Sequence, residues 1–323
     1  MNPLLDVRNL SVTFHTRAGD VHAVDDVSYT LEPGESLAIV GESGSGKSVS
    51  ALSLMGLVPP PGKVENGQLF FKERDLLKLS DKDLQQLRGR EIAMVFQDPM
   101  TSLNPVLTIG HQLSEALVWH QTVSKSDAID RAIETLRLVG IPNAEERLLD
   151  YPHQFSGGQR QRIMIAMAII CGPSLLIADE PTTALDVTIQ AQIVDLVKEL
   201  QNELGMAVIW ITHDLALVAG IVDRVAVMYA GSIVESGTVD AIFSAARHPY
   251  TNGLLQSMPS FDAAVQPRLN SIKGSPPDLR QLVAGCPFAP RCSLVVDQCR
   301  SQCPALKSAG AQSSVACWQA DVR

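Results

Sequence analysis

A glycine-rich run, Gly41-Glu42-Ser43-Gly44-Ser45-Gly46-Lys47-Ser48, carries the clearest chemical signal in the sequence. It fits the pattern Gly-x-x-x-x-Gly-Lys-Ser and lies between an apolar run, residues 36–40, and a segment with helical periodicity. Glycines let backbone N–H groups turn toward phosphate oxygens, Lys47 adds a positive charge, and the Ser48 hydroxyl suits Mg²⁺. The run therefore predicts a phosphate loop that binds a nucleoside triphosphate at a helix N-terminus.

An acidic pair, Asp179-Glu180, ends a second apolar run, residues 175–178. Asp179 is placed to complete the Mg²⁺ shell, and Glu180 is placed to orient and polarise an attacking water. The same pair could also be an acidic helix cap after a strand. With the phosphate loop in the same chain, the pair favours hydrolysis of ATP.

Two more polar side chains stand where predicted strands end. Gln97 follows the apolar run 92–96, at a position where sheets of this kind bind ligands. His213 follows the run 208–211 and either bridges the γ-phosphate and the Glu180 water or is a structural histidine.

The elements that must position these residues follow from periodicity. Alternating apolar residues over 5–14 and 21–31 predict an antiparallel sheet edge. Further strands are expected at 37–40, 68–71, 92–96, 175–178, 208–211 and 225–228, and helices after Lys47 and at 81–88, 159–170 and 187–204. Ser80 and Asp186 are expected to cap two of these helices.

The stretch from about Ile109 to Leu149 has helical spacing and predicts a helical insertion set apart from the sheet. Its apolar positions are Leu113, Leu117, Ile129, Ile133, Leu136 and Leu138. The segment Ser156-Gly157-Gly158-Gln159 then opens a helix whose N-terminus suits an anion.

Composition limits the classes of function. The chain has 323 residues, 46% of them hydrophobic, and a net charge of −9, which argues against a nucleic-acid partner. The N-terminus lacks the pattern of a signal peptide, and no apolar run approaches the roughly 20 residues of a membrane span. We expect a cytosolic protein that reaches a membrane only through partners that span it.

The ordered motifs resemble those of ABC ATPases: the loop 41–48, Gln97, residues 155–159, 175–180, Ala184-Leu185-Asp186 and His213. The resemblance implies an α/β ABC-type nucleotide-binding domain, a P-loop NTPase core with an antiparallel β subdomain and a helical insertion at about 98–160. It also implies that two domains sandwich two ATP molecules, each held by one subunit's phosphate loop and the other's Ser156–Gln159 segment.

The same resemblance assigns roles to single residues. Phe14 matches the aromatic that stacks on adenine, although a core aromatic fits the same pattern. Gln97 matches the glutamine that contacts Mg²⁺ and water and couples the site to membrane subunits. Asp186 matches the aspartate of the family motif that covers Ala184-Leu185-Asp186 here. Phe155 departs from the usual leucine, and because the position is apolar we expect little effect.

Residues beyond about Glu235 predict an added module, so the expected domains are 1–235 and 236–323. Arg247–Thr251 and Gly285–Cys292 resemble the C-terminal extension of ATP-binding subunits of dipeptide and oligopeptide importers. The stretches 97–105 and 184–192, which lie outside the extension, also resemble these subunits. The resemblance covers essentially the whole chain.

Five of the six cysteines cluster in this extension, at 286, 292, 299, 303 and 317. Clustered thiols in a cytosolic chain favour metal binding, and a [4Fe–4S] cluster, Zn²⁺ and reduced structural thiols are the alternatives. The resemblance implies a [4Fe–4S] cluster on Cys286, Cys292, Cys299 and Cys317, with Cys303 as a spare or substitute ligand. Cys171 is expected in the core.

The sequence thus predicts an ATP-hydrolysing subunit of an inner-membrane importer for dipeptides and short peptides, peripheral on the cytoplasmic face. Expected partners are a second ATPase subunit, a distinct paralogue by resemblance, two transmembrane permease subunits and an external substrate-binding protein. Alternatives are an importer ATPase for nickel or haem, a soluble ABC ATPase acting on DNA or ribosomes, and a redox regulator centred on the cysteines.

Overall fold

The computed structural model describes residues 2–98, 102–183, 185–258, 271–280, 284–310 and 313–320. Its contacts divide the chain into two compact units. The first unit comprises Met1–Leu31, Ser36–Leu77 and Ile211–Arg323, and the second comprises Glu32–Glu35 and Lys78–Trp210. The predicted motif residues Pro99, Met100, Thr101 and Ala184 lie outside the described residues.

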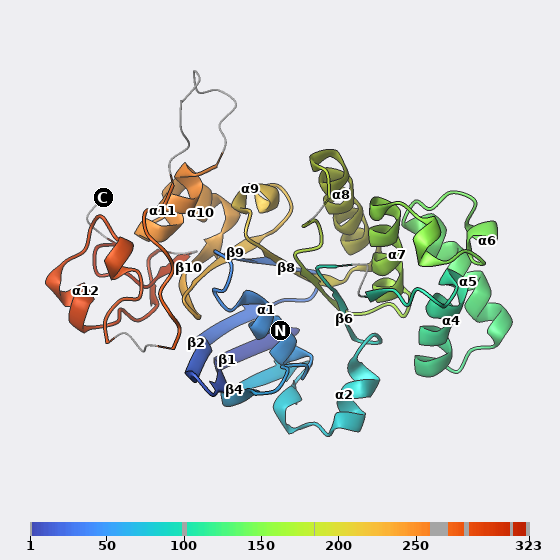
Figure 1. The fold of residues 1–323 in the computed structure, drawn as a ribbon, viewed down its shortest axis with the longest axis horizontal. Helices are drawn as coiled ribbons and strands as arrows, with labels where there is room; N and C mark the ends of the chain where they lie inside the picture. The colour runs from blue at the N-terminus through green and yellow to red at the C-terminus, as the bar shows by residue number, and fades with distance from the viewer. Residues whose placement is uncertain are drawn as a thin grey trace, which may run out of the picture. The chain divides into compact units, whose positions relative to one another are not determined.

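An antiparallel sheet forms the N-terminal part of the first unit (Figure 1). Its strands, in the order β2-β1-β4-β5, are β1 (Leu5–Thr16), β2 (Gly19–Leu31), β4 (Gly62–Phe71) and β5 (Arg74–Asp75). The apolar positions of β1 do not alternate strictly, because its register with β2 shifts between Val7 and Leu10. Asn9 has φ +50° there, and the irregularity lets Val7 and Leu10 both be buried. The predicted antiparallel edge is confirmed.

A second set of strands in the first unit carries the phosphate loop. Strand β3 (Ser36–Val40) pairs in parallel with β9 (Arg224–Tyr229), and β9 pairs in antiparallel with β10 (Ser232–Thr238). The C-terminal strands β12 (Ser313–Val315) and β11 (Lys307–Ser308) extend this order as β11-β12-β10-β9-β3. Every residue of β3 is buried, which agrees with its uninterrupted apolar sequence.

Short helices complete the first unit. They are α1 (Lys47–Leu54), α9 (Leu215–Val218), α10 (Val239–Ala245), α11 (Pro249–Gln256) and α12 (Asp297–Ser301), with a 3-10 turn at Ala289–Arg291. Helix α11 starts with proline at its first position, where the missing N–H costs nothing. Its N-cap residue, His248, accepts a hydrogen bond from the Tyr250 N–H.

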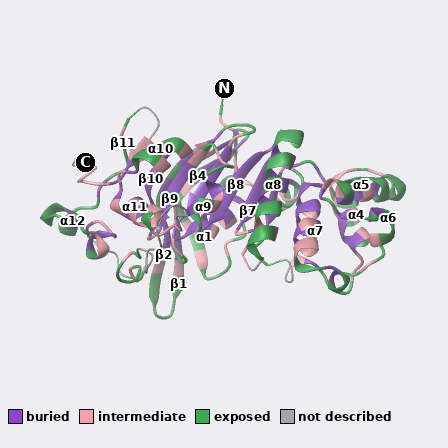
Figure 2. Ribbon diagram, turned by 90° about the horizontal axis from the view of Figure 1, so that it is seen from above, coloured by how far each residue is buried: buried purple, intermediate pink, exposed green. Residues whose placement is uncertain are grey.

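The second unit holds the acidic pair and the helical insertion. Its strands are β6 (Ile92–Val95) and β7 (Leu175–Asp179), which pair in parallel, and most of β8 (Ala207–Thr212), within which the division between the units falls. Its helices are α2 (Asp81–Leu87), α4 (Ile109–His120), α5 (Lys125–Leu138), α6 (Ala144–Arg147), α7 (Gly157–Ile169) and α8 (Val187–Leu204). Figure 2 shows the strands buried and the outer faces of the helices exposed.

The helical insertion follows the predicted pattern with one exception. Leu113, Leu117 and Leu136 are buried, as the spacing predicts. The prediction that Ile129 belongs to the apolar face is wrong, because the residue is 45% exposed. In α5 the buried stripe uses small residues, Ala128 and Ala132, together with Leu136, so the helix packs closely through alanines.

Candidate functional site

The phosphate loop joins β3 to α1, and its glycines are required by close backbone approach. A Cβ on Gly41 would lie 2.1 Å from the Met228 carbonyl oxygen, and a Cβ on Gly46 would lie 2.1 Å from the Ala23 carbonyl oxygen. Gly46 also has φ +100°, a conformation that L side chains rarely adopt. Larger residues would therefore displace backbone at both positions.

Lys47 lies inside the loop and is only 4% exposed. Its Nζ donates to the Gly41 carbonyl at 2.8 Å and to the Glu42 carbonyl at 3.0 Å. The loop thus holds an ammonium group at its centre, where it would pair with the negative charge of a bound phosphate. Ser48 follows in the first turn of α1, whose N-cap residue is Gly46.

Phe14 and His213 belong to the same unit. Phe14 is half-buried in β1 and pairs with Val21 of β2 and with Gly62 of β4. A Cβ on Gly62 would lie 2.6 Å from Phe14 Cε1, so this glycine makes room for the ring. His213 is exposed directly after β8.

The second unit brings together Gln97 and Glu180, which are 83 positions apart in the chain. Strands β6 and β7 pair in parallel, so the residues after them meet at one edge. Gln97 Nε2 donates to Glu180 Oε2 at 3.2 Å. Thr183 Oγ1 donates to the same oxygen at 2.9 Å, a partner that the sequence reasoning missed. Asp179, the last residue of β7, is buried with 8% exposure.

The backbone at Glu180 is unusual. Its φ is +46°, in the left-handed region that costs an ordinary L residue about 1–2 kcal/mol. Such conformations concentrate at functional sites, where the surrounding structure holds a side chain in a required direction. The carboxylate of Glu180 is thereby fixed after a buried aspartate and beside Gln97.

The segment Ser156–Gln159 begins helix α7 with a reciprocal capping box. Ser156 Oγ accepts from the Gln159 N–H at 3.4 Å, and Gln159 Oε1 accepts from the Ser156 N–H at 3.1 Å. Ser156 and Gly157 are exposed, so the N-terminus of α7 faces outward. Phe155 is buried under the Arg147 guanidinium, which lies 4.0 Å from the ring centroid, so the apolar packing expected here is confirmed.

Asp186 occupies the N-cap position of α8, as predicted, but its side chain makes no cap hydrogen bond. The residue is exposed, and Val187 beside it is 82% exposed. The start of α8 therefore exposes both a polar and an apolar side chain to solvent.

Four of the five cysteines of the extension line one small cavity. Cys286, Cys292, Cys299 and Cys317 all line it, together with Phe288, Trp318 and His248, whereas the exposed Cys303 does not. Burial raises the pKa of the Cys286 thiol to about 11 and raises those of Cys292 and Cys317.

The predicted iron–sulfur cluster is not confirmed. Among the residues that the structure describes, no group of three or more His, Cys, Asp or Glu side chains is placed to hold a metal ion. Cys171 is buried with its Sγ 3.7 Å from the Ala116 carbonyl oxygen, which confirms its place in the core.

Comparisons with known proteins match two parts of the chain. Residues 24–183 match the family described as ABC transporter, and residues 234–299 match the family described as oligopeptide/dipeptide transporter, C-terminal region. The dipeptide transport ATP-binding protein DppD of Bacillus subtilis is 54% identical over 324 residues, which is 100% of this chain and 96% of DppD. The oligopeptide transport ATP-binding protein OppD of the same organism is 55% identical over 90% of this chain and 81% of OppD.

The chain belongs to the ABC transporter ATP-binding proteins of the oligopeptide/dipeptide family. Among solved structures, the dimeric post-hydrolysis state of the ATP-binding cassette MJ0796 bound to ADP and Pi is similar, with a TM-score of 0.65 and 28% identity. The similarity covers 73% of this chain and 98% of that one. The predicted α/β fold of an ABC nucleotide-binding domain is therefore confirmed.

Membership in the ABC family identifies the chain as an ATPase coupled to transport. None of the helices in the described part of the chain is long and apolar enough to cross a membrane.

Proposed function

We propose that this chain is the ATP-hydrolysing subunit that powers import of dipeptides and short peptides by an inner-membrane ABC transporter. The observation that carries the proposal is that one chain combines the ABC transporter match with the peptide-transporter C-terminal match. Relatives that align over nearly the whole chain are named for dipeptide and oligopeptide transport.

In this proposal the loop 41–48 binds the ATP phosphates, with Lys47 as the point charge. The Ser48 hydroxyl, the Asp179 carboxylate and the Gln97 amide oxygen are oxygen donors of the kind that Mg²⁺ prefers, and they would hold the ion. Bound Mg²⁺ supplies charge that offsets the negative charge of the phosphates.

Glu180 is the proposed base that orients the attacking water, and its hydrogen bonds to Gln97 and Thr183 support that assignment because they fix the carboxylate. His213 is proposed to stabilise the γ-phosphate. Phe14 is proposed to stack on adenine, which its half-exposed position beside Gly62 favours.

The segment Ser156–Gln159 is proposed to act in trans on the ATP of a second ATPase subunit, a distinct paralogue. Its exposed position at a helix N-terminus supports this, because backbone N–H groups there attract phosphate. Asp186, exposed and without a cap bond, is proposed to take part in the same contact between subunits.

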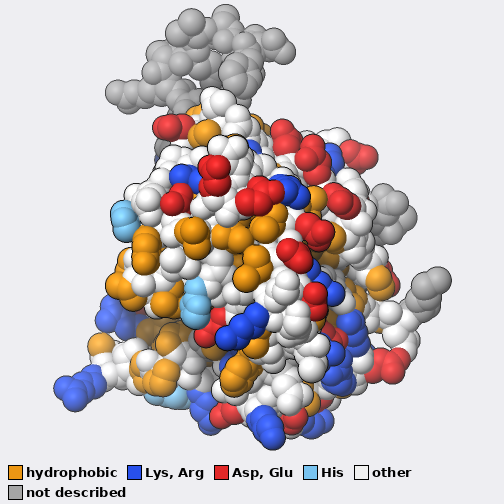
Figure 3. All heavy atoms as spheres, turned by 90° about the vertical axis from the view of Figure 1, so that its right-hand side faces the viewer, with side chains coloured by type: hydrophobic (Ala, Val, Ile, Leu, Met, Phe, Trp, Pro, Cys, Tyr) orange, Lys and Arg blue, Asp and Glu red, His pale blue; other side chains and the backbone are white. Residues whose placement is uncertain are grey.

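Two transmembrane permease subunits are the proposed membrane partners, with a periplasmic or extracellular substrate-binding protein delivering peptide. The helical insertion exposes large apolar side chains, including Trp119 at 75%, Leu149 at 77% and Val106 at 75%. Figure 3 shows hydrophobic side chains gathered on the face where α4 to α6 lie toward the viewer. Such patches mark protein contacts and support docking on the permease subunits. We propose that this contact holds the chain at the cytoplasmic face of the inner membrane.

Reconstitution tests this function. The chain, its paralogue and the permeases are placed in proteoliposomes with ATP on the side of the ATPases, and uptake of a labelled dipeptide is measured. We expect uptake with the wild-type chain and none with Lys47→Ala. Uptake of nickel or haem but of no peptide would contradict the proposed substrate class.

We also propose that residues 1–235 and 236–323 are the two domains and that the second holds a [4Fe–4S] cluster on Cys286, Cys292, Cys299 and Cys317. The four cysteines line one cavity, which brings them near one another, although they are not placed to hold a metal ion in this structure. Anaerobic purification should give a brown protein with stoichiometric iron, and Cys292→Ser should lose the colour. A colourless protein with stoichiometric zinc, or with neither metal, would contradict the cluster.

A further inference from the structure

The second residue of the phosphate loop, Glu42, is held by the C-terminal extension. Arg291 Nη1 lies 2.6 Å from Glu42 Oε2, and Arg291 Nη2 lies 2.9 Å from Glu42 Oε1. The two side chains thus form a bidentate pair across 249 positions of sequence. Arg291 is 5% exposed and Glu42 is 28% exposed, so water screens the pair less than a surface ion pair.

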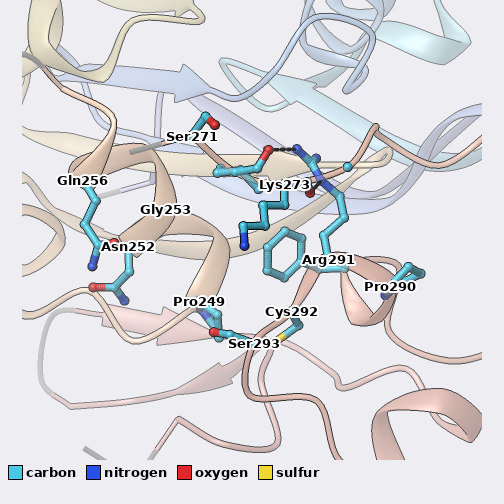
Figure 4. Close-up of a pocket in the computed structure, with 13 residues that line it drawn as sticks. Pro249, Asn252, Gly253, Gln256, Ser271, Lys273, Pro290, Arg291, Cys292 and Ser293 are labelled. Atoms are coloured by element: carbon cyan, nitrogen blue, oxygen red, sulfur yellow. Dashed lines mark hydrogen bonds between the residues drawn. The ribbon is translucent and has the colours of Figure 1, made fainter. Parts of the chain in front are cut away.

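The Arg291 side chain is also held by hydrogen bonds to residues outside the loop. Its Nε donates to the Lys273 carbonyl at 3.0 Å and its Nη2 to the Ile272 carbonyl at 3.3 Å, as the dashed lines in Figure 4 show. Nη1 also lies 3.3 Å from the Tyr229 hydroxyl. Because several partners orient the guanidinium, the bond to Glu42 needs little further ordering of the side chain.

A second side chain of the extension holds the backbone of the same residue. The Tyr250 hydroxyl accepts a hydrogen bond from the Glu42 N–H at 2.8 Å. Tyr250 is fully buried, and its ring packs against Tyr229 at 4.6 Å and Phe288 at 5.5 Å between centroids. The hydroxyl is therefore carried by a packed aromatic cluster that contains residues of both the ATPase core and the extension.

These contacts act directly beside Lys47. The carbonyl of Glu42 accepts from Lys47 Nζ, while the N–H of Glu42 donates to Tyr250. A shift of Glu42 would move one of the two carbonyls that place the ammonium group in the loop.

We propose that Arg291 and Tyr250 are positioning residues through which the C-terminal extension keeps the phosphate loop in its nucleotide-binding shape. The inference rests on the proposed role of the loop 41–48. It gives the extension a part in ATP binding. The loop of this chain then depends on a segment that lies outside the ABC transporter match at residues 24–183.

The test uses the full-length chain in the assembled transporter and measures KM for ATP and kcat separately. Arg291→Ala should raise KM about tenfold while kcat at saturating ATP changes less than about threefold, because bound nucleotide restores the loop. Tyr250→Phe, which keeps the ring, should raise KM by about threefold. Arg280→Ala is the matched control, since Arg280 is an exposed, ion-paired arginine of the extension, and it should leave both constants unchanged.

A double-mutant cycle shows whether Arg291 acts through the carboxylate. In a Glu42→Ala background, Arg291→Ala should change KM less than about twofold. Equal effects in both backgrounds would overturn the proposal. So would an unchanged KM in Arg291→Ala, Arg291→Lys and Tyr250→Phe. If Arg291→Ala does not fold, the Lys and Phe variants decide.

Lys47→Ala separates this inference from the proposed function. If Lys47→Ala leaves ATP binding intact, the loop is not the nucleotide site and the proposed function fails first. If Lys47→Ala abolishes binding while the variants at Arg291 and Tyr250 bind ATP normally, only the positioning role fails.

Discussion

Gly157 and Gly158, at the start of α7, offer a matched pair of substitutions with opposite expected effects. A Cβ on Gly157 would meet only Leu185 Cδ2, at 3.8 Å, whereas a Cβ on Gly158 would lie 2.9 Å from Ile189 Cγ2. Gly157→Ala should therefore leave the free energy of unfolding unchanged or raise it by about 0.4–1 kcal/mol, because alanine restricts the unfolded chain. Gly158→Ala should lower it by about 1–3 kcal/mol, because Ile189 must move.

Gly157→Ala, the variant that should keep its stability, should nevertheless lose ATP turnover. Gly157 is exposed beside Ser156, and the proposed site needs its backbone close to a partner's phosphate. A methyl group there should lower ATP turnover of the assembled transporter at least about tenfold, which corresponds to about 1.4 kcal/mol of barrier.

Denaturant unfolding of the purified chain and ATP turnover of the transporter are the two assays. Full turnover by a Gly157→Ala variant of native stability would refute the placement of this segment against a nucleotide. A Gly158→Ala variant as stable as the wild type would refute the packing argument.

Two further predictions concern the extension. Burial lowers the pKa of His248 to about 3, so the unfolded chain binds more protons between that value and its ordinary pKa of about 6.5, and stability should rise with pH across this window. The free energy of unfolding should fall by about 2 kcal/mol from pH 7 to pH 5. The variant His248→Asn keeps a cap acceptor for the Tyr250 N–H and should lose that pH dependence. An equal slope in both proteins would contradict the assignment of the pH dependence to His248. A Cβ on Gly285 would lie 2.3 Å from the Cys299 carbonyl oxygen, so Gly285→Ala should destabilise the chain by about 1–3 kcal/mol in thermal unfolding, whereas Gly220→Ala, with open space around it, should not.

Local patterns predicted most of the elements because the relevant interactions are local. Ser80 caps α2 by accepting from the Asp83 N–H, and the uninterrupted apolar run of β7 is fully buried. The positions of Gln97 and Glu180 at strand ends were predicted, but their meeting depends on the parallel pairing of β6 with β7, which no local pattern encodes.

Other features depend on contacts that periodicity does not encode. The apolar spacing of α5 placed Ile129 on the buried face, but the tight helix contact selects alanines there. Strand β12 joins the edge of β10 although it has only three residues, too few for an alternation signal. The pairing of Arg291 with Glu42 joins distant segments, and no pattern in the sequence links the two residues.

The positive φ of Glu180 could not be predicted from the sequence either, because glutamate has no preference for that conformation. The conformation becomes meaningful only beside the buried Asp179 and the bonds from Gln97 and Thr183. Strain of this kind at a strand end is consistent with a residue held for chemistry and not for stability.

Glu180 is expected to activate the water that hydrolyses ATP bound at the loop 41–48. Glu180→Gln keeps the size of the side chain and an acceptor for Thr183 but removes the base. ATP turnover by the assembled transporter should nearly vanish while ATP binding to the purified chain is retained. Unchanged turnover with Glu180→Gln would contradict the account.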